Sequence, residues 1–245
     1  LGVNVDNLLL TGVGNTNGTG NALDNVLTGN AGASTLSGGF GNDRLLGGGG
    51  GDTLNGGDGD DVLAPGSGTD SVDGGIGTDT LSYADATSGV TLTLGLSHTV
   101  TVGGGAAGDS AIGIEGLIGS AFADTLTLMA PGADTASSAF GGAGNDFITV
   151  ANSNSGTDSF ARVLRGDAGN DTLRGDQSTA AAGNPSIQHF WLQYDQGFDD
   201  VRFLNSGEDK ILLSAADFNL SATLVGQALP AAQFLTSTDS FAQTQ

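Results

Sequence analysis

Residues 38–64 read GGFGNDRLL GGGGGDTLN GGDGDDVLA, which are three nine-residue units placed end to end. Each unit is rich in glycine, has an aspartate at its sixth position and offers about one large apolar side chain to a core. Burying one leucine stabilises a fold by roughly 1.5–3 kcal/mol, whereas fixing each backbone residue costs roughly 1–2 kcal/mol. Because hydrophobic burial alone does not offset that cost, we expect a ligand from outside the chain to contribute to folding.

The nine-residue period holds over seven consecutive units. Its apolar position is occupied by Leu27, Leu36, Leu45, Leu54, Leu63, Val72 and Leu81. Two residues before each of these stands a polar side chain, in turn Asn25, Ser34, Asp43, Asp52, Asp61, Asp70 and Asp79. Residues 4–12 (NVDNLLLTG) also resemble residues 21–29 (NALDNVLTG), which extends the repeats to the N-terminal region. A fixed short period of this kind is the sequence signature of a repeat architecture.

The composition of each unit predicts how it folds. Its glycine-rich stretch turns sharply, because glycine adopts positive φ angles without steric cost. The residues that follow, such as 53–55, form a short strand whose middle side chain points inward. Two units make one coil, and successive coils stack about 4.8 Å apart through parallel hydrogen bonds. The predicted fold is therefore all-β, a parallel β-roll of the β-helix or solenoid type.

The charge balance indicates that the ligand is a cation. The chain has 27 acidic and 6 basic residues, and so a net charge of −21. This charge should repel nucleic acid and anionic membranes. Stacking turns that carry aspartate is disfavoured without cations, and with cations the binding energy becomes folding energy. Calcium accepts about 6–8 oxygen ligands at about 2.3–2.6 Å. Zinc would favour histidine or cysteine, and the turns contain neither.

The repeat resembles the glycine- and aspartate-rich nonapeptide repeats of the RTX family of secreted bacterial proteins. The resemblance is close over residues 38–82 and looser, with insertions, over residues 116–176. It implies a calcium-binding parallel β-roll in which each ion lies between stacked turns. In that family the sixth-position carboxylate and backbone carbonyl groups of the glycine region hold the ion.

The resemblance implies a set of calcium ligands in this sequence. The implied carboxylate ligands are Asp43, Asp52, Asp61, Asp70 and Asp79 in the first block and Asp146 and Asp171 in the second. The implied backbone ligands are Gly39, Gly41, Gly48, Gly50, Gly57, Gly59, Gly66, Gly68, Gly75 and Gly77. Aspartate is also common in turns for conformational reasons alone. This alternative weighs most for Asp124 and Asp134, which lie in poorer matches to the repeat.

With two units per coil, alternate turns lie on the same edge of the roll. The aspartates of the first block should fall on two edges, with Asp43, Asp61 and Asp79 on one and Asp52 and Asp70 on the other. Ions are expected between neighbours on an edge, namely between turns 43 and 61, 61 and 79, and 52 and 70. Asn25 and Ser34 replace the carboxylate in the preceding turns, where no ion is expected. The stacking partners of Asp146 and Asp171 stay open at this stage.

The composition divides the chain into four regions. We predict a first β-roll block at residues 1–82, a β spacer at 83–115, a second, irregular block at 116–178 and an aromatic-rich capping region at 179–245. Thr80–Gly95 alternates apolar and polar residues, which predicts β-strand. The segment Gln188–Phe218 is predicted to cover the open end of the parallel stack.

The sequence has no recognisable catalytic motif. The two histidines, His98 and His189, lie in no metal or triad motif, and neither an HExxH helix nor a GxSxG elbow is present. The chain has no cysteine, and no apolar run approaches the roughly 20 residues of a membrane span. We therefore predict a chain that is not an enzyme, has no transmembrane segment and does not bind nucleic acid.

Three classes of function are compatible with this sequence. The resemblance implies a calcium-binding module that folds after type I secretion, without a cleaved N-terminal signal, as a structural part of a larger extracellular or cell-surface protein. Such a protein would be a surface-layer, adhesin or filament protein, and its partners would be copies of itself or cell-surface polysaccharide. Alternatively, the chain is the C-terminal tail of a secreted hydrolase or polysaccharide-modifying enzyme. In the third class, the chain itself is catalytic through a carboxylate pair.

Overall fold

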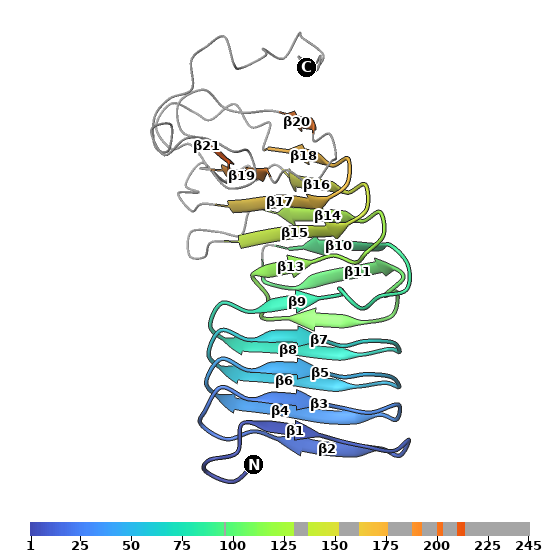
Figure 1. The fold of residues 1–245 in the computed structure, drawn as a ribbon, viewed down its shortest axis with the longest axis vertical. Coiled ribbons are helices and arrows are strands. Elements are labelled where there is room, and N and C mark those ends of the chain that lie inside the picture. The colour runs from blue at the N-terminus through green and yellow to red at the C-terminus, as the bar shows by residue number, and fades with distance from the viewer. Residues whose placement is uncertain are drawn as a thin grey trace.

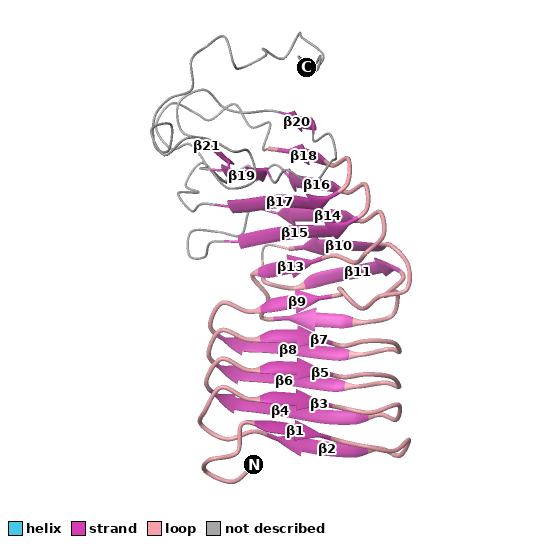
Figure 2. Ribbon diagram, viewed as in Figure 1, coloured by secondary structure: helices cyan, strands magenta, loops and turns pink. Residues whose placement is uncertain are grey.

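The fold consists of strands and turns wound into stacked coils. The computed structural model describes residues 1–95, 97–129, 137–151 and 162–175, together with the backbone of three further strands. These described residues contain no helix (Figure 2), and so none that is long and apolar enough to cross a membrane. The prediction of an all-β parallel roll is confirmed.

Two sheets form the long sides of the roll, and the chain winds from one to the other along the stack (Figure 1). The first sheet contains, in spatial order, β1 (Asn7–Leu9), β3 (Val26–Thr28), β5 (Arg44–Leu46), β7 (Val62–Ala64), β9 (Thr80–Ser82), β13 (Gly116–Ile118), β15 (Ser137–Ala143), β17 (Arg162–Ala168), β19 (Gln188–Leu192) and β21 (Lys210–Leu213). The second sheet contains β2 (Thr16–Thr19), β4 (Ser34–Phe40), β6 (Thr53–Asp58), β8 (Ser71–Ile76), β12 (Ser110–Ile112), β11 (Val100–Gly104), β10 (Val90–Leu94), β14 (Thr125–Met129), β16 (Phe147–Ala151), β18 (Thr172–Arg174) and β20 (Asp200–Arg202).

Strands of successive coils pair in register. In the first sheet Leu45 lies opposite Leu27 on one side and Leu63 on the other. In the second sheet Leu36 lies opposite Leu54. Among the described strands, every pairing is parallel except β10 with β11 and β11 with β12. Because register decides which face a side chain occupies, the apolar residues of all coils point to the same interior.

The core is the thin apolar column that the period predicts. Its first-block members are at most 2% exposed, and they are Leu27, Leu36, Leu45, Leu54, Leu63, Val72 and Leu81. Beyond the spacer the fully buried residues Leu117, Leu126, Ile148, Leu164 and Leu173 extend it. All of these side chains belong to one cluster, so the two blocks share a single hydrophobic core.

The spacer interrupts only one of the two sheets. In the first sheet β9 pairs directly with β13, whereas in the second sheet β12, β11 and β10 are inserted between β8 and β14. The prediction of β-strand over Thr80–Gly95 is correct only in part, because β9 ends at Ser82 and β10 begins at Val90. Tyr83 enters the core at this break. The Thr-Ser-Gly sequence at residues 87–89 then favours a turn over an extended strand.

The second block continues both sheets. Residues 130–136 and 152–161, between its strands, lie outside the described residues. Beyond this block β19, β20 and β21 pair in parallel with the strands before them. Apart from these three strands, the predicted capping segment Gln188–Phe218 lies outside the described residues, so the cap stays a prediction.

Truncating one inward side chain should have a large effect on stability. In the calcium-saturated protein we expect Leu54→Ala to lower the free energy of unfolding by about 2–5 kcal/mol, because it removes buried contacts and leaves a cavity. Thr53→Ala, at the exposed neighbouring position, should change it by less than about 0.5 kcal/mol. Denaturation followed by circular dichroism measures both variants. Equal losses of stability in the two variants would contradict the inward orientation of Leu54.

Candidate metal sites

Glycine allows the turns of neighbouring coils to approach each other closely. All ten glycines that the resemblance implies as backbone ligands have φ between 91° and 151°, a region that only glycine adopts readily. A Cβ on Gly57 would collide with the carbonyl oxygen of Gly39, one coil below. The carbonyl groups of these turns therefore lie close to the backbone of the next coil.

The sixth-position aspartates form hydrogen-bonded ladders along the stack. On the first edge, which leads into the first sheet, the N–H of Asp43 donates to Oδ1 of Asp61 at 2.7 Å. The N–H of Asp61 donates in the same way to Oδ1 of Asp79 at 2.8 Å. On the second edge, which leads into the second sheet, the N–H of Asp52 donates to Oδ1 of Asp70 at 2.6 Å. The structure therefore brings these five aspartates together on two edges, as their spacing predicts.

Each of these aspartates keeps one buried oxygen without a hydrogen-bond partner. The five side chains are at most 2% exposed, and the Oδ2 atoms that accept no hydrogen bond belong to Asp43, Asp52, Asp61, Asp70 and Asp79. Oδ2 of Asp146 is in the same condition. Burying an ionised oxygen without a partner is strongly unfavourable unless an opposite charge compensates. These oxygens therefore indicate a bound cation.

The register supplies the stacking partners that the sequence left open for Asp146 and Asp171. On the second edge the N–H of Asp124 donates to Oδ1 of Asp146, and the N–H of Asp146 to Oδ1 of Asp171, both at 2.8 Å. Asp124 differs because both of its oxygens have donors, which are Ser120 N–H at 2.5 Å, Ser120 Oγ at 2.8 Å and Val90 N–H at 2.7 Å. Asp134 lies outside the described residues.

The first edge changes character beyond the spacer. Gly116 lies opposite Ser138, and Ser137 lies opposite Arg162. By this register, Ser137 and Arg162 occupy the position along the first edge at which each turn of the first block carries an aspartate. Their exposed fractions are only 3% and 1%. The buried guanidinium of Arg162 is positively charged, whereas the turns of the first block carry negatively charged carboxylates at the same position. The acidic ladder of this edge therefore does not continue through Ser137 and Arg162.

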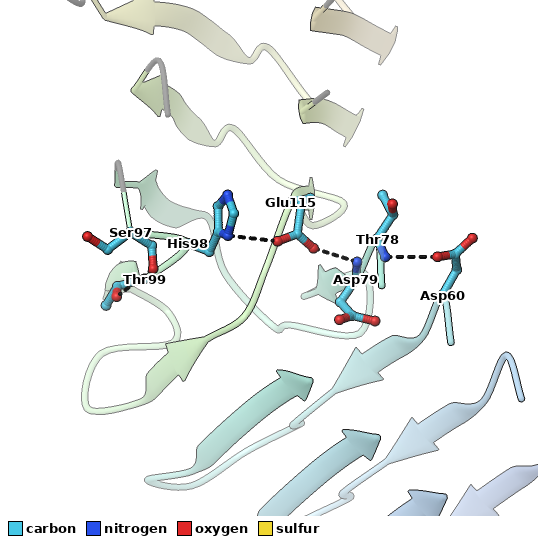
Figure 3. Close-up of polar contacts among 7 residues, drawn as sticks. All are labelled: Asp60, Thr78, Asp79, Ser97, His98, Thr99 and Glu115. Atoms are coloured by element: carbon cyan, nitrogen blue, oxygen red, sulfur yellow. Dashed lines mark hydrogen bonds and ion pairs between the residues drawn. The ribbon is translucent and has the colours of Figure 1, made fainter. Parts of the chain in front are cut away.

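The structure adds two carboxylates to the ladders that sequence reasoning missed, and both lie in the spacer. Glu115 Oε2 accepts the N–H of Asp79 at 2.7 Å, and Asp109 Oδ1 accepts the N–H of Asp70 at 2.8 Å. Their other oxygens have protein partners, since His98 Nδ1 lies 3.2 Å from Glu115 Oε1 (Figure 3) and the Tyr83 hydroxyl donates to Asp109 Oδ2 at 2.8 Å. No local motif marks either residue, and only the strand register reveals them.

Burial raises the pKa of six ladder aspartates above the ordinary value of 3.8, namely Asp43, Asp52, Asp61, Asp70, Asp79 and Asp146. The pKa of Asp61 and of Asp70 rises to about 6, and that of Asp79 and of Asp146 to about 7. Removal from water is the largest cause in each case, neighbouring carboxylates add to it, and the backbone hydrogen bond at Oδ1 opposes it. Without a cation, the ionised form of these side chains is therefore disfavoured in the folded state.

The donor set fits calcium. Within the described residues, no three side chains of histidine, cysteine, aspartate or glutamate gather around one point, so an ion here needs other oxygen ligands, such as backbone carbonyls. Such oxygens are present, because a Cβ on Gly56 would collide with both Oδ2 of Asp61 and the carbonyl oxygen of Gly74 in the next coil. Carboxylate and carbonyl oxygens in a flexible arrangement are the ligands that calcium prefers.

The raised pKa values predict how the calcium-free roll responds to pH. The folded state binds these protons more tightly than the unfolded chain does, so this contribution to stability is complete below the ordinary pKa and is lost as pH rises through about 6 to 7. We expect circular dichroism of calcium-depleted protein to show more β-structure at pH 5 than at pH 8. A flat profile, or a loss of β-structure on acidification, would contradict this.

The close approach of the turns predicts that Gly56 cannot carry a side chain. Gly56→Ala places a Cβ against Asp61 Oδ2 and Gly74 O, and we expect it to weaken calcium binding and to lower the free energy of unfolding by about 1–3 kcal/mol. Gly14→Ala is the matched control, because no atom lies within 4 Å of its Cβ position. Calcium titration and denaturation measure both. Indistinguishable variants would refute the role of Gly56.

The comparisons with known proteins agree with this geometry. The family model described as the RTX calcium-binding nonapeptide repeat matches the chain in four copies, at residues 19–54, 46–81, 132–154 and 163–178. The first two copies include the five first-block aspartates, and the last two include Asp146 and Asp171. A comparison of the whole sequence with curated proteins finds no match.

Proposed function

Since the nonapeptide region of this chain belongs to the RTX calcium-binding repeat family and forms a calcium-binding β-roll, we propose that it is a structural module of a larger extracellular protein. In this proposal the module folds when it meets calcium outside the cell. RTX repeat regions are structural calcium-binding domains rather than catalytic ones. Surface-layer, adhesin or filament proteins are the class of parent protein that we propose. Copies of the chain or cell-surface polysaccharide are the partners that we propose for it.

The observation that carries this proposal is the set of buried aspartate oxygens without hydrogen-bond partners. Such Oδ2 atoms occur in the turns of Asp43, Asp52, Asp61, Asp70, Asp79 and Asp146. In a chain with a net charge of −21, each added coil increases repulsion between carboxylates. Because the unfolded chain has no preformed site, cation binding stabilises only the folded roll, and the binding free energy becomes folding free energy.

The expected affinity supports a switch between compartments. Extracellular calcium modules bind the ion with dissociation constants of about 10⁻⁴–10⁻³ M. A site in that range is empty at low calcium and filled at millimolar calcium. The chain would then stay unfolded before secretion and fold afterwards, which suits the secreted bacterial proteins in which RTX repeats occur.

Removal of calcium tests this proposal. In excess chelator at pH 7.5 we expect the circular dichroism spectrum to lose most of its β-signal, because the aspartate turns repel one another. Millimolar calcium should restore the signal, whereas the same concentration of magnesium should restore little, since magnesium needs a strict octahedral site and gives up its water reluctantly. A spectrum that does not change in chelator would count heavily against calcium-dependent folding.

A further inference from the structure

In the regular coils, the free oxygen of an aspartate lies beside a carbonyl oxygen of the next coil. Around Gly38 these two oxygens are Asp43 Oδ2 and Gly56 O, and a Cβ on Gly38 would collide with both. Around Gly56 the corresponding pair is Asp61 Oδ2 and Gly74 O. Each candidate site thus joins a buried carboxylate oxygen to a carbonyl group of the coil that follows it.

The same arrangement occurs once more where the first block meets the spacer. A Cβ on Gly74 would lie 2.7 Å from Oδ2 of Asp79 and would collide with the carbonyl oxygen of Gly113. Asp79 is 0% exposed, and its Oδ2 has no hydrogen-bond partner. Gly113 belongs to the spacer, and no copy of the nonapeptide family model includes it. An unpaired buried oxygen therefore lies beside a segment that no copy of the repeat covers.

Glu115 takes the place that an aspartate has in the regular coils. In the strand register Ile112 lies opposite Asp73, and Gly116 lies opposite Thr80. Residues 113–115 therefore connect the two sheets at the place where residues 74–79 connect them in the preceding coil. The glutamate side chain is one methylene longer than aspartate, and it reaches across this shorter turn to accept the N–H of Asp79 at 2.7 Å. Glu115 is only 4% exposed, so its side chain is buried like those of the aspartates on the first edge.

The row of carboxylates along the first edge ends at Glu115. Figure 3 shows Glu115 between His98 and Asp79, with Oε2 on the Asp79 N–H and Oε1 beside His98 Nδ1 at 3.2 Å. In a regular aspartate, the oxygen that does not accept the ladder hydrogen bond is free. In Glu115 the corresponding oxygen lies beside the imidazole of His98. The following coils carry Ser137 and Arg162 at this edge instead of carboxylates.

We propose that a calcium ion binds between Asp79 and Glu115, with Asp79 Oδ2, the Gly113 carbonyl oxygen and the Glu115 carboxylate among its ligands. This inference rests on the proposed calcium-dependent function. It places one more ion on the first edge than the nonapeptides encode. The spacer is then a ligand-bearing part of the calcium array, and Glu115 is the terminal ligand of the first edge.

Calcium stoichiometry of a conservative variant tests the site. Glu115→Gln keeps an oxygen that can accept the Asp79 N–H but removes the charge, so titration calorimetry should count one calcium ion fewer per chain than in the wild type. Asp85→Asn is the matched control, because Asp85 is an exposed carboxylate of the same spacer and its loss should leave the count unchanged. An equal count in the wild type and Glu115→Gln overturns the inference. A wild type that binds no calcium overturns the proposed function itself.

A crystal structure of the wild-type chain grown in calcium decides the question even if Glu115→Gln fails to fold. The proposal requires an anomalous calcium peak about 2.3–2.6 Å from Asp79 Oδ2, Gly113 O and a Glu115 oxygen. Peaks between Asp43 and Asp61 and between Asp61 and Asp79, without one at Glu115, would refute this inference and leave calcium binding by the repeats intact.

Discussion

The buried aspartate oxygen that has no donor within the protein is the constraint on which the rest of this structure depends. The core is a single column of side chains such as Leu54 and Leu126, so each coil gains little from hydrophobic burial. The polar edges therefore decide whether the coils stack. Glycine turns bring the oxygens of adjacent coils close together, where they repel one another without a cation and bind one jointly when it is present.

The period of nine residues was sufficient to predict most of the fold. It assigns Leu54 to the interior and Asp61 to an edge, because a strict repeat fixes both the strand face and the stacking partner. It fails where the period breaks. Glu115 and Asp109 join the edges only because β13 pairs with β9 and β12 pairs with β8, and no local sequence feature encodes those long-range pairings. The break after Ser82 was missed for a related reason, since the alternation of apolar residues continues through a turn.

The two edges of the roll differ in their chemistry. The second edge is acidic in both blocks, from Asp52 to Asp171, whereas the first edge is acidic only up to Glu115 and then carries the buried Arg162. A guanidinium cannot leave when calcium is withdrawn. The second block should therefore depend on calcium mainly along one edge, while the first block depends on it along both.

The direction of the aspartate ladders gives the roll a polarity. In every rung of the buried sixth-position ladders the acceptor belongs to the later coil, so Asp61 accepts the amide N–H of Asp43 and Asp79 accepts that of Asp61. A coil loses the acceptor of a buried amide when its C-terminal neighbour is detached, and it loses the donor to a carboxylate oxygen when its N-terminal neighbour is detached. The two ends of the stack therefore differ chemically, because the C-terminal end presents amide N–H groups without acceptors and the N-terminal end presents carboxylate oxygens without donors.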